Sequence, residues 1–247
     1  MTSAVATPIA ATPKVGRTVA VALLMGLSIQ AVGTLAWVGL IGLNVRESPG
    51  VPWAAATMAG VLALMLLWLN GHGWPRRTSA FRRDHLRLWQ PPPGAWSGES
   101  LIAILGLIGA MVALSVLYVL IAASRPPVDV SAYSIALRWS SLLMSPAVAG
   151  VVEEMAFRGY MQRHLERIGP TFAILVTSAA FTLLHATQGP TYLLTLGPGI
   201  FLASTVYGYL ALRSGSILPG MVLHVAGDFG FFYFVLLGGD PALLFAD

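Results

Sequence analysis

The chain has 247 residues and no cysteine, and its composition excludes an ordinary soluble domain. Hydrophobic residues make up 56% of it and charged residues only 10%, with a mean hydropathy of +0.76 and a formal net charge of +4. Soluble domains carry about 25% charged residues. Disulfides and thiolate metal sites are excluded because cysteine is absent. We therefore predict an all-α protein, a polytopic transmembrane helical bundle surrounded by the lipid bilayer. No nucleic-acid partner is expected, because no aromatic and basic recognition module is visible.

Seven apolar segments follow one another, and each is predicted to form a helix because lipid cannot satisfy open backbone groups. They are residues 18–43, 53–70, 100–123, 135–157, 170–186, 191–212 and 216–238. Since about 20 residues cross a bilayer, we expect about seven spans. The first segment is long enough to be retained as a spanning helix rather than removed as a signal peptide.

The sixth apolar segment is interrupted by Gly197-Pro198-Gly199. Proline removes a backbone donor and clashes with the preceding helical turn. The helix is therefore expected to begin at Pro198, leaving 187–197 as an outer loop or a re-entrant piece.

Basic residues are distributed unevenly between the loops. If the N-terminus is cytoplasmic, eleven Lys and Arg residues fall on the inner side and three, Arg46, Arg125 and Arg138, on the outer side. This bias predicts a multi-pass protein of the cell (plasma or inner) membrane with a cytoplasmic N-terminus. The expected parts are a disordered tail 1–17, N-terminal transmembrane helices 18–130, a second helical part 131–238 and a short tail 239–247.

The largest polar interruption is 71–99, which holds five arginines and Pro91-Pro92-Pro93. We interpret it as a solvated cytoplasmic loop that fixes the topology. A basic patch that binds anionic lipid headgroups is the alternative, and both interpretations are compatible.

Two adjacent acids, Glu153 and Glu154, lie in an otherwise apolar segment. Ionisable residues inside a membrane are rare and indicate a functional site. Glu154 and Arg158 are four residues apart, so they share a helix face and are expected to pair. Glu153 points about 100° away and is expected to face a cavity. The alternative is an ion pair that pins a helix end, with Glu153 at the interface. If the pair draws Arg158 inward, the acids lie about 15 Å deep rather than about 7 Å.

Two histidines also lie in apolar segments. His185 follows Phe181 by one helical turn, and His224 and Asp228 are four residues apart on one face. An aspartate that accepts a hydrogen bond from an imidazole orients the ring, and the same two residues are a plausible pair of metal ligands. Simple structural hydrogen bonds are the alternative for each histidine.

Glutamate and histidine side chains in this combination suit peptide hydrolysis. A glutamate can take a proton from water with the help of an imidazole, and the oxyanion that forms needs donors or a metal. Zinc held by Glu153, His185, His224 and Asp228, with one position open for water, is the alternative chemistry. No His-Glu-x-x-His zinc motif and no Gly-x-Ser-x-Gly nucleophile motif occurs.

Taken in order, three motifs resemble the CPBP family, the CAAX proteases and bacteriocin-processing (Abi) intramembrane proteases. The motifs are Glu153-Glu154-Met-Ala-Phe-Arg158-Gly159, Phe181-Thr-Leu-Leu-His185 and His224-Val-Ala-Gly-Asp228, the last preceded by Gly208 and Ser214-Gly-Ser. The resemblance covers about 145–230 and implies that 131–238 is a catalytic helical core with a polar cavity. Residues 1–130 carry no recognisable motif.

The resemblance also implies a role for each residue. Glu153 and His185 would activate water, His224 and residue 228 would stabilise the oxyanion, and Arg158 would brace the acidic pair, with Glu154 in a supporting role. The family usually has Asn where this chain has Asp228, and an ionised aspartate cannot donate to an oxyanion. We therefore expect Asp228 to accept from His224, so that the imidazolium is the donor.

The function predicted from these residues is an intramembrane endopeptidase acting on a peptide or membrane-tethered protein. The alternatives are a non-catalytic membrane scaffold or bacteriocin-immunity-type protein, in which the polar groups hold helices together, and a small-solute or proton carrier. Carriers more often contain paired repeats with matching broken helices, and only one such break is seen here.

Overall fold

The computed structural model describes residues 14–95, 97–122 and 133–237, and these residues form helices and no strand. The α-helices are α1 (Val15–Glu47), α2 (Trp53–Leu69), α3 (Ser79–Leu86), α4 (Gly98–Ala122), α5 (Ile135–Glu153), α6 (Gln162–Leu165), α7 (Pro170–Leu184), α8 (Pro190–Ser214) and α9 (Leu218–Leu237). Two 3-10 helices, η1 (Arg76–Thr78) and η3 (His185–Gln188), and one π-helix, η2 (Glu154–Met161), complete the described part. The predicted all-α bundle is confirmed.

Each of the seven predicted apolar segments corresponds to a helix. Five helical stretches of the described chain are long and apolar enough to cross a membrane: Val15–Glu47, Gly98–Leu117, Ile135–Leu165, Pro170–Gln188 and Pro190–Ser214. α2 is apolar but has only 17 residues. The predicted tail 239–247 lies outside the described residues, as does 1–13 of the predicted tail 1–17, whereas α1 already begins at Val15.

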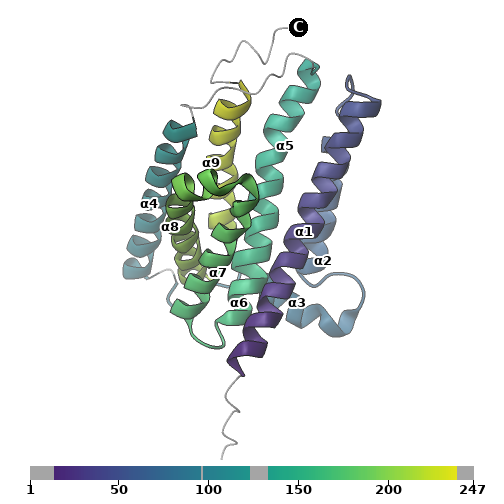
Figure 1. Ribbon diagram of the computed structural model, residues 1–247. Helices are drawn as coiled ribbons and strands as arrows, with labels where there is room; N and C mark the ends of the chain where they lie inside the picture. Colours follow the sequence, from purple (N-terminus) through teal and green to yellow (C-terminus); the bar gives the residue numbers. More distant parts are fainter. Residues whose placement is uncertain (1–13, 96, 123–132, 238–247) are drawn as a thin grey trace, which may run out of the picture.

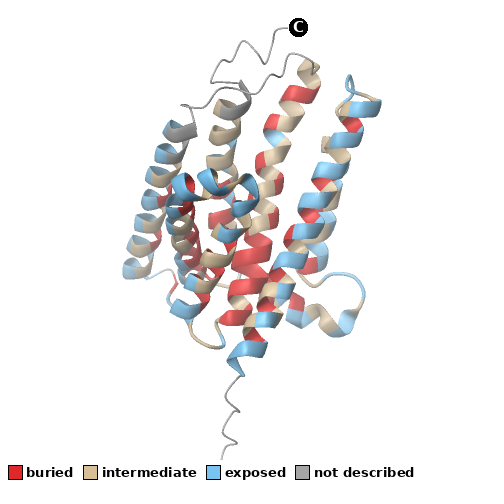
Figure 2. Ribbon diagram, viewed as in Figure 1, coloured by how far each residue is buried: buried red, intermediate tan, exposed pale blue. Residues whose placement is uncertain are grey.

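Successive long helices alternate in direction, so that the bundle has two ends (Figure 1). α5 continues through η2 into α6 and packs against α1, α2 and α9. α4 covers α8 and α9 on the opposite side. All eight residues of η2 are buried, and Figure 2 shows the buried residues gathered around this stretch, in the lower half of the bundle.

Close contact between α5 and α9 depends on small residues. A Cβ atom added at Gly150 would lie 2.6 Å from a methyl carbon of Val225 and 2.8 Å from its backbone nitrogen. A Cβ added at Gly220 would lie 2.9 Å from Glu154 Oε2. These glycines let the backbone of α9 approach the acidic residues, which a larger residue would prevent.

The expectation that the sixth helix begins at Pro198 is wrong. α8 begins at Pro190, where a missing N–H costs nothing because the first turn has no partner for it. Pro198 lies within the helix, as membrane helices tolerate when their neighbours satisfy the freed backbone groups. Most of 187–197 is therefore helical, and the segment that joins α7 to α8 lies at mid-height of the bundle (Figure 1).

The interruption 71–99 is more than a solvated loop. It contains η1 and α3, and α3 packs against η2. Arg82 and Arg87 are each only 3% exposed, while Arg76, Arg77 and Arg83 remain exposed. The Arg82 side chain donates to the carbonyl of Trp68 in the last turn of α2 and to those of His72, Gly73 and Pro75 after it. Solvation therefore describes only part of the segment.

Candidate active site

The two acids lie where the α-helix changes into a π-helix. Glu153 is the last residue of α5, and Glu154 is the first of η2. At the end of η2 the amide of Gln162 is shared between the carbonyl of Gly159 and that of Phe157, five residues earlier. π-helical stretches inside α-helices are frequent at functional sites.

Glu154 and Arg158 form the expected ion pair. Arg158 Nη1 lies 3.0 Å from Glu154 Oε1, and both side chains are 0% exposed. Arg158 also donates to Ser204 Oγ at 2.9 Å, and its guanidinium lies 4.6 Å from the Phe181 ring and 5.2 Å from the Tyr207 ring. Arg158 is thus buried inside the protein, as the deeper of the two placements of the acids requires, and their depth in the membrane stays a prediction.

Glu153 has different neighbours from Glu154, as expected from its position on the helix. Its Oε1 accepts a hydrogen bond from Gln30 Nε2 at 3.3 Å, and its side chain is 13% exposed. Gln30 lies on α1, in the part of the chain without a recognisable motif, and sequence reasoning missed it. The available signal was that Gln30 is the only amide side chain in the apolar segment 18–43.

His224 contacts three carboxylates. Its Nδ1 lies 3.0 Å from Glu154 Oε1, and its Nε2 lies 3.5 Å from Glu153 Oε2 and 3.8 Å from Asp228 Oδ2. Because an ionised carboxylate only accepts, Nδ1 carries the hydrogen of the bond to Glu154. The Tyr207 ring stacks on the imidazole with centroids 5.1 Å apart.

The expected hydrogen bond from His224 to Asp228 is absent from this arrangement. At 3.8 Å the two atoms are beyond hydrogen-bond distance. Glu154 takes the orienting place instead, because the close approach of α9 to α5 and η2 brings Nδ1 onto its carboxylate. Asp228 faces the other nitrogen.

His185 begins η3, directly after α7, and its Nδ1 donates to the carbonyl of Phe181 at 2.9 Å. A carbonyl only accepts, so Nδ1 carries the hydrogen and Nε2 of the neutral ring is left as an acceptor. The Phe181 ring lies 4.9 Å from the His185 ring and 6.1 Å from the His224 ring. Phe181 is therefore a common neighbour of the two imidazole rings.

A cavity of about 260 Å³ adjoins these groups. His185, His224 and Asp228 line it together with Phe181 and Tyr207. The remaining wall is mainly apolar and comes from α4 and α8, with Met111, Leu114, Leu117, Leu196, Ile200 and Ala203. Glu153 does not line the cavity. Its Oε2 lies 3.5 Å from Nε2 of His224, which does line it. The cavity thus combines a cluster of polar side chains with room for an apolar group.

The residues present do not assemble the alternative zinc site. Within the described residues, no group of three or more His, Asp or Glu side chains is arranged to hold a metal ion. His185 Nδ1 and His224 Nδ1 bond to protein oxygens, so Nε2 is the nitrogen that each ring presents to the site. In this arrangement the side chains of Glu153, His185, His224 and Asp228 are available for proton transfer and hydrogen bonding.

Comparison with known proteins found one family. Residues 135–230 match the model of the type II CAAX prenyl endopeptidase Rce1-like family. No curated protein and no solved structure matches the chain. The matched segment runs from α5 into α9 and contains all six predicted site residues. The resemblance inferred from the three motifs is confirmed over this segment, and at the family level residues 135–230 are similar to CAAX-type endopeptidases.

Proposed function

We propose that the protein is an intramembrane endopeptidase that hydrolyses a peptide bond in a membrane-associated protein or peptide. The observation that carries the proposal is the position of His224: it is held on Nδ1 by the buried Glu154–Arg158 pair and presents Nε2 to Glu153, Asp228 and the cavity. The family match over 135–230 supports the same activity.

In the proposed reaction Glu153 is the general base. Its carboxylate takes a proton from a water molecule as the water oxygen attacks the carbonyl carbon of the substrate. The free Nε2 of His185 accepts the second hydrogen bond of this water. Glu153 then returns the proton to the leaving nitrogen as the carbon–nitrogen bond breaks, so no other reactant is needed.

His224 stabilises the oxyanion in this proposal. With Nδ1 donating to Glu154, the ring is fixed so that Nε2–H points at the developing charge. Glu154 therefore acts as the orienting acid, the role that sequence reasoning gave to Asp228. Asp228 favours a hydrogen on Nε2 through its charge rather than through a hydrogen bond.

The apolar wall of the cavity favours a membrane-tethered substrate. The matched family is described as a prenyl endopeptidase, so a peptide that carries a prenyl group on its C-terminal CAAX sequence is the first probe. We further propose that the end of the bundle with α3 and α6 is cytoplasmic, in the cell membrane, as the basic residues of 71–90 and 158–167 favour.

The proposal is tested by comparing wild type with Glu153→Gln, which keeps the shape of the side chain and removes the base. We expect about a thousandfold loss of cleavage of a prenylated CAAX peptide in proteoliposomes, with unchanged expression and melting temperature. Glu47→Gln, an exposed acid at the end of α1, is the matched control.

A second measurement covers other substrates. New peptide ends are quantified in membranes of cells that express wild type or Glu153→Gln. Ends that depend on the Glu153 carboxylate support the peptidase. Identical sets of ends, with no cleavage of the probe by wild type, contradict it and favour the scaffold.

A further inference from the structure

We propose that Arg87 is a positioning residue of the candidate active site, because it completes the hydrogen bonding of the π-helix that carries Glu154 and Arg158. The inference rests on the proposed function. Arg87 lies between α3 and α4, outside the matched segment 135–230. A part of the chain that carries no family motif would therefore have a role in the reaction.

The hydrogen bonds of η2 leave one backbone carbonyl over. The amide of Gln162 is shared between Phe157 O and Gly159 O, and the amide of Glu166 bonds to Gln162 O. With four-residue spacing after η2, the amides of residues 163–165 face the carbonyls of residues 159–161, so the carbonyl of Arg158 is the one without a backbone amide. A return from five-residue to four-residue spacing always skips one carbonyl, and a buried carbonyl without a donor is costly.

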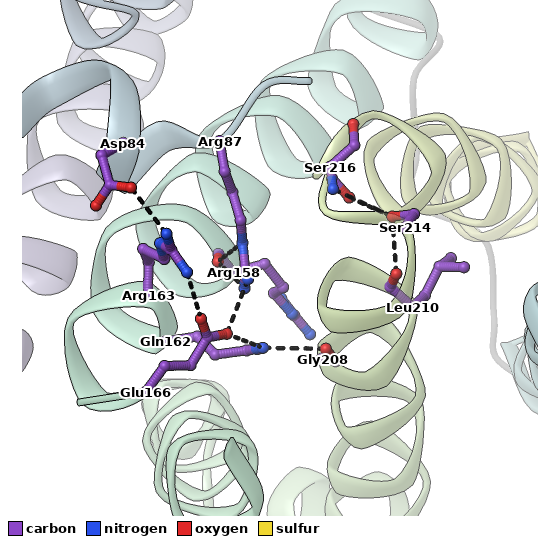
Figure 3. A network of polar contacts seen from close by, with 10 residues as sticks. All are labelled: Asp84, Arg87, Arg158, Gln162, Arg163, Glu166, Gly208, Leu210, Ser214 and Ser216. Atoms are coloured by element: carbon purple, nitrogen blue, oxygen red, sulfur yellow. Dashed lines mark hydrogen bonds and ion pairs between the residues drawn. The ribbon is translucent and has the colours of Figure 1, made fainter. Parts of the chain in front are cut away.

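Arg87 supplies the missing donors to Arg158 O. Its Nη2 lies 2.8 Å and its Nε 3.2 Å from this oxygen. The third nitrogen, Nη1, lies 2.8 Å from Glu166 Oε1, and the Arg87 side chain is only 4% exposed. Figure 3 shows the guanidinium spanning from the Arg158 backbone to Glu166, with Gln162 and Arg163 bonded to the same glutamate.

The backbone of Arg87 indicates that its side chain is needed. Arg87 ends α3 in the left-handed conformation, with φ 40° and ψ 50°. Glycine adopts this conformation without strain and other residues do so at a cost. A residue with a side chain persists in such a position when its surroundings hold it there.

The same residue also contacts the other element of the site. The carbonyl of Arg87 accepts from the amide of Ile217, just before α9, and Gln90 N donates to Gly215 O at 2.8 Å. Arg87 therefore joins η2, which carries Glu154, to the beginning of α9, which carries His224. The Glu154–His224 hydrogen bond depends on the relative position of these two elements.

Gly159 allows this contact to form. A Cβ at Gly159 would lie 3.3 Å from the carbonyl oxygen of Leu86, the last residue of α3. The absence of a side chain lets the end of α3 lie directly on η2. Gly159, the glycine of the first motif, thus allows Arg87 to reach the backbone of η2.

Loss of Arg87 is expected to favour a return of η2 to four-residue spacing. This change shifts the hydrogen-bond register by one residue, which rotates the helix before η2 by about 100° relative to the helix after it. Glu153 and Glu154 would then leave their partners on α1 and α9. Such misplacement lowers the rate of the chemical step while leaving the apolar substrate contacts in place.

The experiment compares Arg87→Gln, Arg87→Lys and the control Arg83→Gln in the full-length protein. Arg83 is exposed and one turn earlier on α3. We expect kcat of Arg87→Gln on the prenylated peptide to fall about 10- to 100-fold, with KM changed less than about twofold. Arg87→Lys should restore part of kcat, and Arg83→Gln should match wild type. Hydrogen exchange of the η2 amides, which needs no substrate, should be faster in Arg87→Gln only.

Equal kcat and equal η2 exchange in folded Arg87→Gln and Arg83→Gln would overturn the inference. If Arg87→Gln does not fold, Glu166→Gln decides, because it removes the charged partner of Nη1 and should lower kcat and loosen η2 in the same direction. The two proposals fail separately. Cleavage that does not depend on Glu153 contradicts the proposed peptidase. Cleavage that depends on Glu153 but is unchanged in Arg87→Gln contradicts only the positioning role of Arg87.

Discussion

The parts of the bundle before and after residue 135 contribute to the site in different ways. The later part supplies the ionisable groups that face one another around His224. The earlier part supplies neutral or basic residues that hold them: Gln30 on Glu153, Arg87 on the backbone of Arg158, and the α4 wall of the cavity. Reactive groups and their supports thus come from different regions, and only the former carry family motifs.

The largest expected effect tests the later part. Arg158→Gln leaves Glu154 buried at 0% exposure without its ion pair, and breaking a buried pair in this way costs about 3–5 kcal/mol. We expect a large fall in melting temperature together with loss of cleavage, measured by thermal unfolding in detergent. Arg213→Gln, an exposed arginine at the end of α8, should behave as wild type. Equal stability of the two variants would mean that the pair does not hold the site.

A smaller effect tests the earlier part. Gln30→Leu keeps the size of the side chain and removes the donor to Glu153 Oε1. Because a hydrogen bond to a charged group contributes about 1.5–3 kcal/mol, we expect kcat to fall about tenfold while the protein stays folded. Ser28→Ala, an exposed position on the same helix, is the control. An unchanged kcat in Gln30→Leu would show that α1 does not support Glu153, and would contradict the supporting role given to the part of the chain before residue 135.

The sequence predicts most of the fold and the polar residues of the candidate site for simple physical reasons. Apolar length defines each helix, and charges inside apolar segments mark the site, as with Glu153 and His224. The partner of His224 was misassigned because four-residue spacing brings Asp228 onto the same face, whereas Glu154 comes close only through the packing of α9 on η2. Gln30 and Arg87 were missed because support across 71 or 123 residues of sequence leaves no local pattern.

The same lack of a local sequence pattern explains why the sequence predicts neither the π-helix nor α3. Nothing in the composition of 154–161 distinguishes π from α spacing, since the change depends on donors brought from elsewhere. The arginines of 71–99 look alike in the sequence, yet Arg82 and Arg87 find buried carbonyls while Arg76 and Arg77 remain exposed. Burial of such groups is decided by tertiary contacts.

The smallest expected effect concerns the junction between the two parts. His85 on α3 is 1% exposed, and its Nε2 lies 3.2 Å from Nδ1 of His164 on α6. Burial lowers the pKa of His85 from 6.5 to about 4. Burial alone would raise the pKa of the neighbouring Asp84, but Arg163, 2.8 Å away, outweighs it and keeps this pKa below its usual value. At neutral pH the junction therefore holds a neutral His85 beside an ionised Asp84.

The sign of the pH effect follows from the direction of the His85 shift. Between pH 6.5 and about 4 the unfolded state binds more protons at His85 than the folded state, so stability is present above this window and is lost as the pH falls through it. We expect the melting temperature of wild type to fall about 3 °C more than that of His85→Gln across the window, with the exposed His72→Gln as the control. If His85→Gln loses as much as wild type, protonation of His85 does not weaken the junction, and the contact of α3 with α6 does not depend on a neutral imidazole.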